Sequence, residues 1–259
     1  MNIVVLMKHV VDTGAIRIDR TTRQPILRGS LTKISDYDKN AIEEAIRIKE
    51  KLGAKVTLLS VSPSEAALTS LREGVAMGAD DAILISTGTE YLFDNYVIAT
   101  AIVNAIKKFI GGYDLILAGE ISEDLSQGYI PAVVATMLGI PFIGSVRKIE
   151  VLDKKVRVER RMEEYIETLE SPIPVLLSVT REINKPRIPT TLQIKRVPLA
   201  KIRTYTLQDV GVSKDNAMTY LEKLEAEEIS KRKGVILSGS PDEIVIKLLE
   251  YLRKEGVLE

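Results

Sequence analysis

The segment from Tyr113 to Gly139 combines features that could hold a phosphate group. An apolar run, Leu115 to Ala118, is typical of a buried strand; it ends at Gly119 and is followed by a short polar loop and an apolar helix. A strand, a turn of small residues and the free N–H groups of a new helix together form a cradle for anions. The helix start would contribute roughly 0.3–1 kcal/mol toward a bound phosphate. The loop contains no Lys or Arg, and the same arrangement also occurs as plain scaffold in open α/β sheets.

Residue types that are absent exclude several kinds of site. The chain has no Cys and one His, His9, which excludes thiolate nucleophiles, disulfides, cysteine-ligated metals and a His-rich metal site. Neither of the common glycine-rich phosphate motifs, Gly-x-Gly-x-x-Gly and Gly-x-x-x-x-Gly-Lys-Ser/Thr, occurs. Redox or group-transfer chemistry must therefore come from a bound cofactor, and we predict no metal site.

Composition limits the partners and the compartment. Lys plus Arg and Asp plus Glu number 36 each, and the zero net charge argues against binding of nucleic acid. No apolar run is long enough to cross a membrane, and Met1 leads directly into a predicted strand, so no signal or transit peptide is visible. We therefore expect a cytoplasmic protein without direct membrane insertion.

Strands and helices that would position the loop alternate through the first half of the chain. Ser35 and Ser62 are predicted to cap the first two helices. Repeated strand–helix units of this length indicate an α/β fold with a doubly wound, mostly parallel, Rossmann-like sheet. The patterns predict strands at residues 3–7, 56–61, 82–85 and 115–118, and helices at residues 38–52, 63–77, 95–110 and up to 138.

After Gly139 the pattern changes. Residues 183–212 show no regular period and contain several prolines, so we predict an arm there, with a final helix after Ser240. The chain is therefore divided into an α/β domain, residues 1–182, and a C-terminal arm, residues 183–259, that packs on another subunit. Further predicted elements are antiparallel strands added to the sheet at residues 145–151, 156–160, 165–169 and 175–180, and a helix at residues 216–231.

Four further segments form a recognisable pattern through their order and spacing along the chain. They are Val4–Thr13, Ser35–Ala45, Gly74–Asp80 and Asn184–Arg187. Together they resemble the beta subunit of electron-transfer flavoproteins along nearly the whole chain. The resemblance implies a heterodimer in which one FAD is held mainly by the alpha subunit, and an adenine nucleotide lies in the Rossmann-like domain of the beta subunit. It also implies electron exchange with a dehydrogenase or a quinone oxidoreductase, with ferredoxin as a further candidate partner.

The resemblance also implies which residues bind the nucleotide. Most follow the carboxyl ends of successive parallel strands, where ligands of open α/β sheets collect. Three of these residues have alternatives to nucleotide binding. His9 could have a structural role, Asp12 could order a turn, and Asp38 could belong to a plain helix start. The predicted contacts are Leu6, Lys8, His9, Val10, Asp12, Thr13, Ser35, Asp36, Tyr37, Asp38, Val61, Ala118, Gly119, Glu120, Ile121, Ser122, Glu123, Asp124, Leu125, Ser126, Gln127 and Gly128.

Three functions are compatible with these residues. The pair Asp12-Thr13, followed by Ile16–Asp19, is similar to the electron-bifurcating and nitrogen-fixation-associated branch, in which the beta subunit holds a second FAD and NAD(H) supplies electrons. We favour this branch. In the ordinary branch the beta subunit holds AMP as a structural ligand. A stand-alone adenine-nucleotide sensor is the third alternative, although it would have no need of the long arm.

The arm contains a candidate docking segment. The resemblance places partner-recognition residues at Thr191, Leu192 and Ile194. An exposed aliphatic side chain on a loop stiffened by Pro189 would fill a partner's pocket at little cost in conformational entropy. The alternative is that Leu192 packs beneath the alpha subunit.

Overall fold

The computed structural model describes all 259 residues of the chain except 28, 64, 88–93, 214–216, 228–233 and 259. The chain divides into two compact units, Met1–Leu224 and Glu225–Glu259. The sequence places the end of the α/β domain at residue 182, but the first unit extends further, to Leu224. The reason is that one strand of the predicted arm joins the sheet. The second unit contains α6 (Pro241–Lys254). The predicted final helix after Ser240 is confirmed, and at its start Ser240 and Glu243 accept each other's backbone N–H groups.

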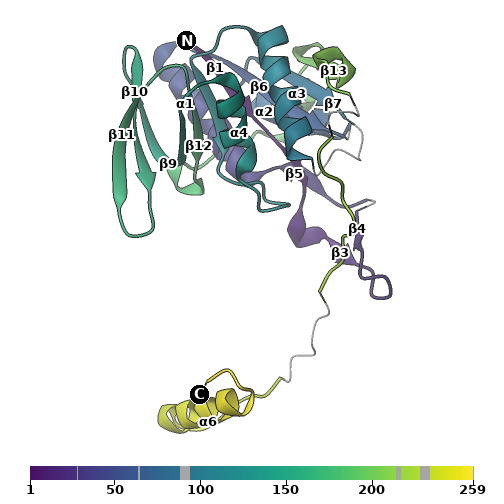
Figure 1. Cartoon of the computed structure of the whole chain (residues 1–259), viewed down its shortest axis with the longest axis vertical. Coiled ribbons are helices and arrows are strands. Elements are labelled where there is room, and N and C mark those ends of the chain that lie inside the picture. Colours follow the sequence, from purple (N-terminus) through teal and green to yellow (C-terminus); the bar gives the residue numbers. More distant parts are fainter. Residues whose placement is uncertain (28, 64, 88–93, 214–216, 228–233, 259) are drawn as a thin grey trace. The chain divides into compact units, whose positions relative to one another are not determined.

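A nine-stranded sheet forms the centre of the first unit (Figure 1). Its strands lie in the order β11-β10-β9-β12-β8-β1-β6-β7-β13. Their bounds are β1 (Asn2–Leu6), β6 (Lys55–Ser62), β7 (Asp81–Ser86), β8 (Leu115–Gly119), β9 (Phe142–Val151), β10 (Lys155–Arg161), β11 (Ile166–Pro172), β12 (Val175–Val179) and β13 (Ile202–Thr206). Two small antiparallel ladders pair β2 (His9–Val11) with β5 (Thr32–Ile34) and β3 (Arg17–Ile18) with β4 (Pro25–Ile26).

Helices cover both faces of this sheet. Because successive residues of a strand point to opposite faces, Val5 of β1 lies in a core with α1 and α2, and Val4 lies in a second core with α3 and α4. The predicted doubly wound, mostly parallel α/β fold is confirmed. The helices of the first unit are α1 (Asp36–Leu52), α2 (Ala67–Met77), α3 (Asn95–Ala105, continued by a π-helix over Ile106–Ile110), α4 (Tyr129–Leu138) and α5 (Thr191–Arg196).

Two strands differ from their predictions. The sequence predicts β12 as an antiparallel addition, but β12 pairs in parallel with both β8 and β9. All its residues are buried, as expected for a strand inside a parallel sheet, whereas β10 does run antiparallel to β9 and β11. β13 comes from the segment predicted to have no regular structure, and it pairs in parallel with β7. Only Ile202 of this short strand is buried, so the sequence shows no clear alternation there.

Several helix boundaries also differ. α1 begins directly after Ser35, but the Ser35 hydroxyl makes no capping hydrogen bond. The predicted capping box fails because the carboxylate of Asp38 binds the ends of two strands instead. α2 begins at Ala67 rather than at Pro63. Residues 217–227 are not helical, which corrects the prediction for the described part of residues 216–231; the rest of that range lies outside the described residues.

The described residues limit the kind of site that the fold could hold. No helix in this part of the chain is long and apolar enough to span a membrane. Within the same residues, no group of three or more His, Cys, Asp or Glu side chains is arranged to hold a metal ion.

Candidate functional site

The carboxyl ends of β1, β6 and β8 meet at one edge of the sheet, beside the first turns of α1, α3 and α4. A cavity lies at this edge, with walls that are mostly apolar and a few polar groups among them. This is the edge at which open α/β sheets bind their ligands. The residues that line the cavity are Leu6, Met7, Lys8, Asp38, Leu59, Val61, Pro63, Asn95, Ile98, Ile102, Ala118, Gly119, Ile121, Ser122, Leu125, Gln127, Ile130 and Pro131.

Asp38 joins three of these elements. Its Oδ2 accepts the backbone N–H of Lys8 at 2.8 Å, and its Oδ1 accepts the backbone N–H of Gly119 at 2.9 Å. The carboxylate therefore ties the first turn of α1 to the ends of β1 and β8. Burial raises the pKa of Asp38 to about 7, although the two N–H groups and the Lys8 ammonium act in the opposite direction.

Two glycines allow the backbone to pass close to its neighbours at this edge. A Cβ atom on Gly119 would lie 2.6 Å from Asp38 Oδ1 and 2.6 Å from Cβ of Tyr37. A Cβ atom on Gly128 would lie 2.7 Å from the carbonyl oxygen of Glu120, at the other end of the same loop. The loop between them is closed by a hydrogen bond of 2.8 Å from Ser122 N–H to the Gln127 carbonyl. The predicted small-residue turn is therefore a compact loop.

Two lysines beside the loop are paired with its carboxylates. Lys8 Nζ lies 2.8 Å from Asp124 Oδ1, and Lys33 Nζ lies 2.9 Å from Glu123 Oε1. Burial would lower the pKa of Lys33, but hydrogen bonds to Glu123 and Asp36 outweigh it and raise that pKa. The charge around the loop is thus largely balanced within the chain. A bound phosphate would depend on N–H and O–H donors, or would compete with Asp124 for Lys8.

Part of the predicted set lines the cavity. Among these residues, Ser122 has a hydroxyl that is buried and makes no hydrogen bond within the described chain. A buried donor of this kind is expected to find a partner, and a ligand oxygen would provide one. The predicted residues in the lining are Leu6, Lys8, Asp38, Val61, Ala118, Gly119, Ile121, Ser122, Leu125 and Gln127.

The other predicted residues lie outside the lining. His9 lies against α2, with Nδ1 2.8 Å from Ser70 Oγ; burial lowers the pKa of its imidazole, and the charge of Asp124 acts in the opposite direction. Asp12 accepts the N–H of Gly14 and caps a single helical turn, as its structural alternative requires. For these residues a contact with the nucleotide stays a prediction. They are His9, Val10, Asp12, Thr13, Ser35, Asp36, Tyr37, Glu120, Glu123, Asp124, Ser126 and Gly128.

Sequence reasoning missed one wall of the cavity. The first two turns of α3 contribute Asn95, Ile98 and Ile102, and α4 contributes Ile130 and Pro131. The predicted fold alone could have indicated these residues, because in a doubly wound sheet the helices start at the edge where the strands end. The predicted set lacks these side chains, and it also lacks Met7, Leu59 and Pro63, which lie in or directly after β1 and β6.

Known proteins resemble this chain over its whole length. A family model described as the electron transfer flavoprotein domain matches residues 26–208. The electron transfer flavoprotein subunit beta of Thermoanaerobacterium thermosaccharolyticum is 37% identical, with 100% of both chains covered. Two further beta subunits are each 32% identical. The one from Clostridium acetobutylicum covers 98% of this chain and 99% of its own length. The one from Megasphaera elsdenii covers 100% of both chains. The chain belongs to the electron transfer flavoprotein family, as a beta subunit.

Membership in the family has direct consequences. A beta subunit takes part in electron transfer together with an alpha subunit, and the family binds flavin- or AMP-related nucleotides. The predicted family is therefore confirmed, and the alternative of a stand-alone nucleotide sensor is wrong. The cavity of this beta subunit, with its apolar walls, compact loop and unsatisfied Ser122 hydroxyl, fits a nucleotide of that kind.

Proposed function

We propose that this beta subunit binds FAD in the cavity at the ends of β1, β6 and β8, and that the heterodimer takes electrons from NAD(H) for flavin-based bifurcation. The observation that supports a nucleotide here is one cavity that combines apolar walls with the compact loop of residues 119–128. The pair Asp12-Thr13 favours the bifurcating branch. When bound, the flavin supplies the ring that accepts electrons and passes them on.

The lining residues divide into two groups that suit the two ends of an adenine nucleotide. Leu59, Val61 and Ile102 offer apolar surface of the kind that contacts a flat aromatic ring. Ser122 and Gln127 offer a hydroxyl and a side-chain amide, both able to donate hydrogen bonds to phosphate oxygens. Asp38 holds the two strand ends in place by accepting their backbone N–H groups.

AMP is the second candidate for this cavity. The loop carries Glu120, Glu123 and Asp124, and the nearby Lys8 is already paired with Asp124. Because little free positive charge is available, this electrostatic balance favours one phosphate group over two. With AMP bound, the chain would be an ordinary beta subunit whose nucleotide has a structural role.

The proposed partners follow from the same assignment. They are the alpha subunit, which holds the other FAD, and a dehydrogenase or quinone oxidoreductase, with ferredoxin as the acceptor of low-potential electrons. An anaerobic titration of the purified heterodimer with NADH tests the electron donor. We expect NADH alone to bleach the visible flavin absorbance. A heterodimer that dithionite reduces fully, but NADH leaves oxidised, would contradict the bifurcating function and favour the ordinary one.

A further inference from the structure

The chain segment that follows β13 runs along α3 in the direction opposite to the helix. Near the C-terminal end of α3, Asn104 donates to the carbonyl of Val210 at 2.8 Å. At the N-terminal end, the carboxylate of Asp94 accepts the backbone N–H groups of Met218 and Thr219. The later part of this segment therefore lies beside the first turn of α3.

Asp94 is only 1% exposed, and its two oxygens bind different parts of the chain. Oδ1 caps α3 by accepting the backbone N–H groups of Tyr96 and Val97, both at 3.0 Å. Oδ2 accepts the backbone N–H groups of Met218 at 2.7 Å and Thr219 at 2.9 Å. Burial would raise the pKa of Asp94, but these four N–H groups outweigh it and lower that pKa. One ionised carboxylate thus joins the start of α3 to the C-terminal segment.

The first turns of α3 form one wall of the cavity. Asn95, Ile98 and Ile102 line it, and Asn95 directly follows Asp94 in the chain. Because N–H groups at this helix start already bind a buried carboxylate, they are not available to a phosphate group. This wall therefore suits the uncharged, aromatic end of a nucleotide, whereas the loop of residues 119–128 suits its phosphates.

We infer that Asp94 is a positioning residue for the nucleotide site: it fixes the wall on which the ring end of the nucleotide rests, and it makes Met218 and Thr219 part of the support of that wall. The inference rests on the proposed function, because it needs a nucleotide in the cavity. A nucleotide that packs on α3 restrains the helix start, and through Asp94 it also holds the segment in place. The coupling is reciprocal, so detaching the segment weakens nucleotide binding by the same factor.

The two oxygens of Asp94 allow its two attachments to be separated by one substitution. In Asp94→Asn, the carbonyl oxygen can still accept from Tyr96 and Val97, and Asn caps a helix about as well as Asp. The amide nitrogen then faces the N–H groups of Met218 and Thr219, donor against donor. This variant should keep α3 and release the segment.

Dialysis of the purified heterodimer against buffer without nucleotide tests the inference. The FAD and AMP that stay bound are counted at intervals, and the nucleotide of this cavity is the AMP, or the FAD in excess of one for each heterodimer. We expect Asp94→Asn to lose this nucleotide about tenfold faster than the wild type, because weaker binding shows mainly in the dissociation rate. If the wild type holds no second nucleotide, the proposed function fails together with the inference. If the wild type holds one and Asp94→Asn loses it at the wild-type rate, the inference alone fails.

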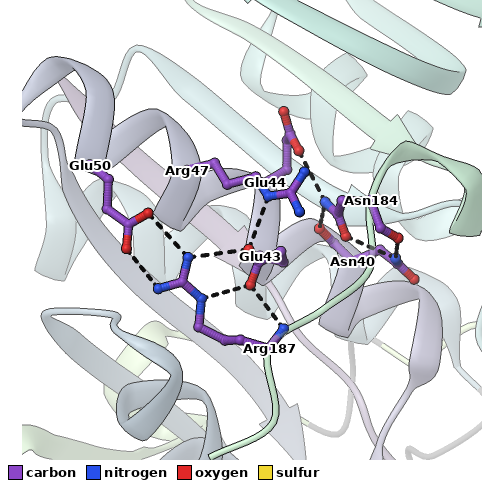
Figure 2. Close-up of polar contacts among 7 residues, drawn as sticks. All are labelled: Asn40, Glu43, Glu44, Arg47, Glu50, Asn184 and Arg187. Carbon is purple, nitrogen blue, oxygen red and sulfur yellow. Dashed lines mark hydrogen bonds and ion pairs between the residues drawn. The ribbon is translucent and has the colours of Figure 1, made fainter.

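Two control variants separate positioning from a general loss of stability. Glu43→Gln is the matched change of a buried acid to its amide, because Glu43 also holds a distant segment on its helix: it accepts a hydrogen bond of 2.8 Å from Nε of Arg187 (Figure 2). Asn104→Ala releases the same segment at the far end of α3. Neither residue lines the cavity, so both variants should lose nucleotide at the wild-type rate. Loss as fast as in Asp94→Asn would overturn the inference.

Hydrogen exchange in the wild-type heterodimer tests the coupling without any substitution. After dialysis has removed the nucleotide, the backbone amides of Met218 and Thr219 should exchange about tenfold faster than before, whereas those of β13 should not change. A helix cap with a structural role alone would give no such response to the nucleotide. Exchange of the Met218 and Thr219 amides at the same rate with and without nucleotide would overturn the inference, even if Asp94→Asn destabilises the chain.

Discussion

Substitution of Gly119 by Ala is the sharpest test of how the site is built. The added Cβ would lie 2.6 Å from Asp38 Oδ1, 2.6 Å from Cβ of Tyr37 and 2.8 Å from the Tyr37 carbonyl carbon. None of these atoms is the free end of a flexible side chain, since Asp38 is held by two N–H groups and Tyr37 lies in the first turn of α1. Either α1 must move away from β8, or Asp38 must lose a hydrogen bond.

The size of the effect follows from these two alternatives. Overpacking a close contact costs roughly 1–3 kcal/mol, and loss of a hydrogen bond to a charged acceptor costs roughly 1.5–3 kcal/mol. Because either movement also opens the cavity edge, we expect Gly119→Ala to lower the free energy of unfolding by about 3 kcal/mol and to reduce bound nucleotide. Urea unfolding of the heterodimer, followed by nucleotide analysis, measures both effects.

Gly112→Ala provides the matched control. Nothing lies within 4 Å of the Cβ that would be added there, and its φ is not in the left-handed region. A glycine in such a position tolerates alanine, so the change in unfolding free energy should stay within about 0.5 kcal/mol. A loss below about 1 kcal/mol for Gly119→Ala, or equal losses for the two variants, would refute the close approach of β8 and α1.

Three further predictions concern single residues. The pKa of Asp38 is about 7 in the folded chain, above its ordinary 3.8, so its contribution to stability is complete below about pH 4 and is lost as pH rises to about 7. Over this pH range the free energy of unfolding should fall by up to about 4 kcal/mol because of Asp38. Asp38→Asn should abolish this fall, and a variant whose free energy of unfolding falls with pH as in the wild type would contradict the prediction. Ser126→Asp should reduce bound nucleotide, because a carboxylate beside phosphate repels it; unchanged content would show that the loop is misassigned. Leu192→Ala should slow electron transfer to the partner with flavin content unchanged, whereas loss of the alpha subunit would make Leu192 structural.

Short-range sequence patterns predicted most strands and helices of the parallel part of the sheet. The apolar runs of β1, β6, β7 and β8 and the glycines that end the helices were enough to indicate a parallel sheet and the edge where a ligand would lie. β13 was missed because only Ile202 of Ile202–Thr206 is buried, so almost no pattern remains in the sequence.

Contacts between distant residues could not be predicted in the same way. Asp38 looks like part of a helix start, but its partner Gly119 is 81 residues away, and that bond outcompetes a capping box. Arg187 and Glu43 are 144 residues apart, so the motif Asn184–Arg187 was visible while its purpose was not. Charges and amides of this kind acquire a role only when the fold brings them together.

The nucleotide content of the heterodimer tests the central claim most directly. The chain should be co-expressed with its alpha subunit, purified and denatured, and the released nucleotides separated and counted against protein. We predict two FAD molecules for each heterodimer, one of them from the cavity of this beta subunit. One FAD and one AMP would contradict the assignment of FAD to this cavity, and would identify the chain as an ordinary beta subunit.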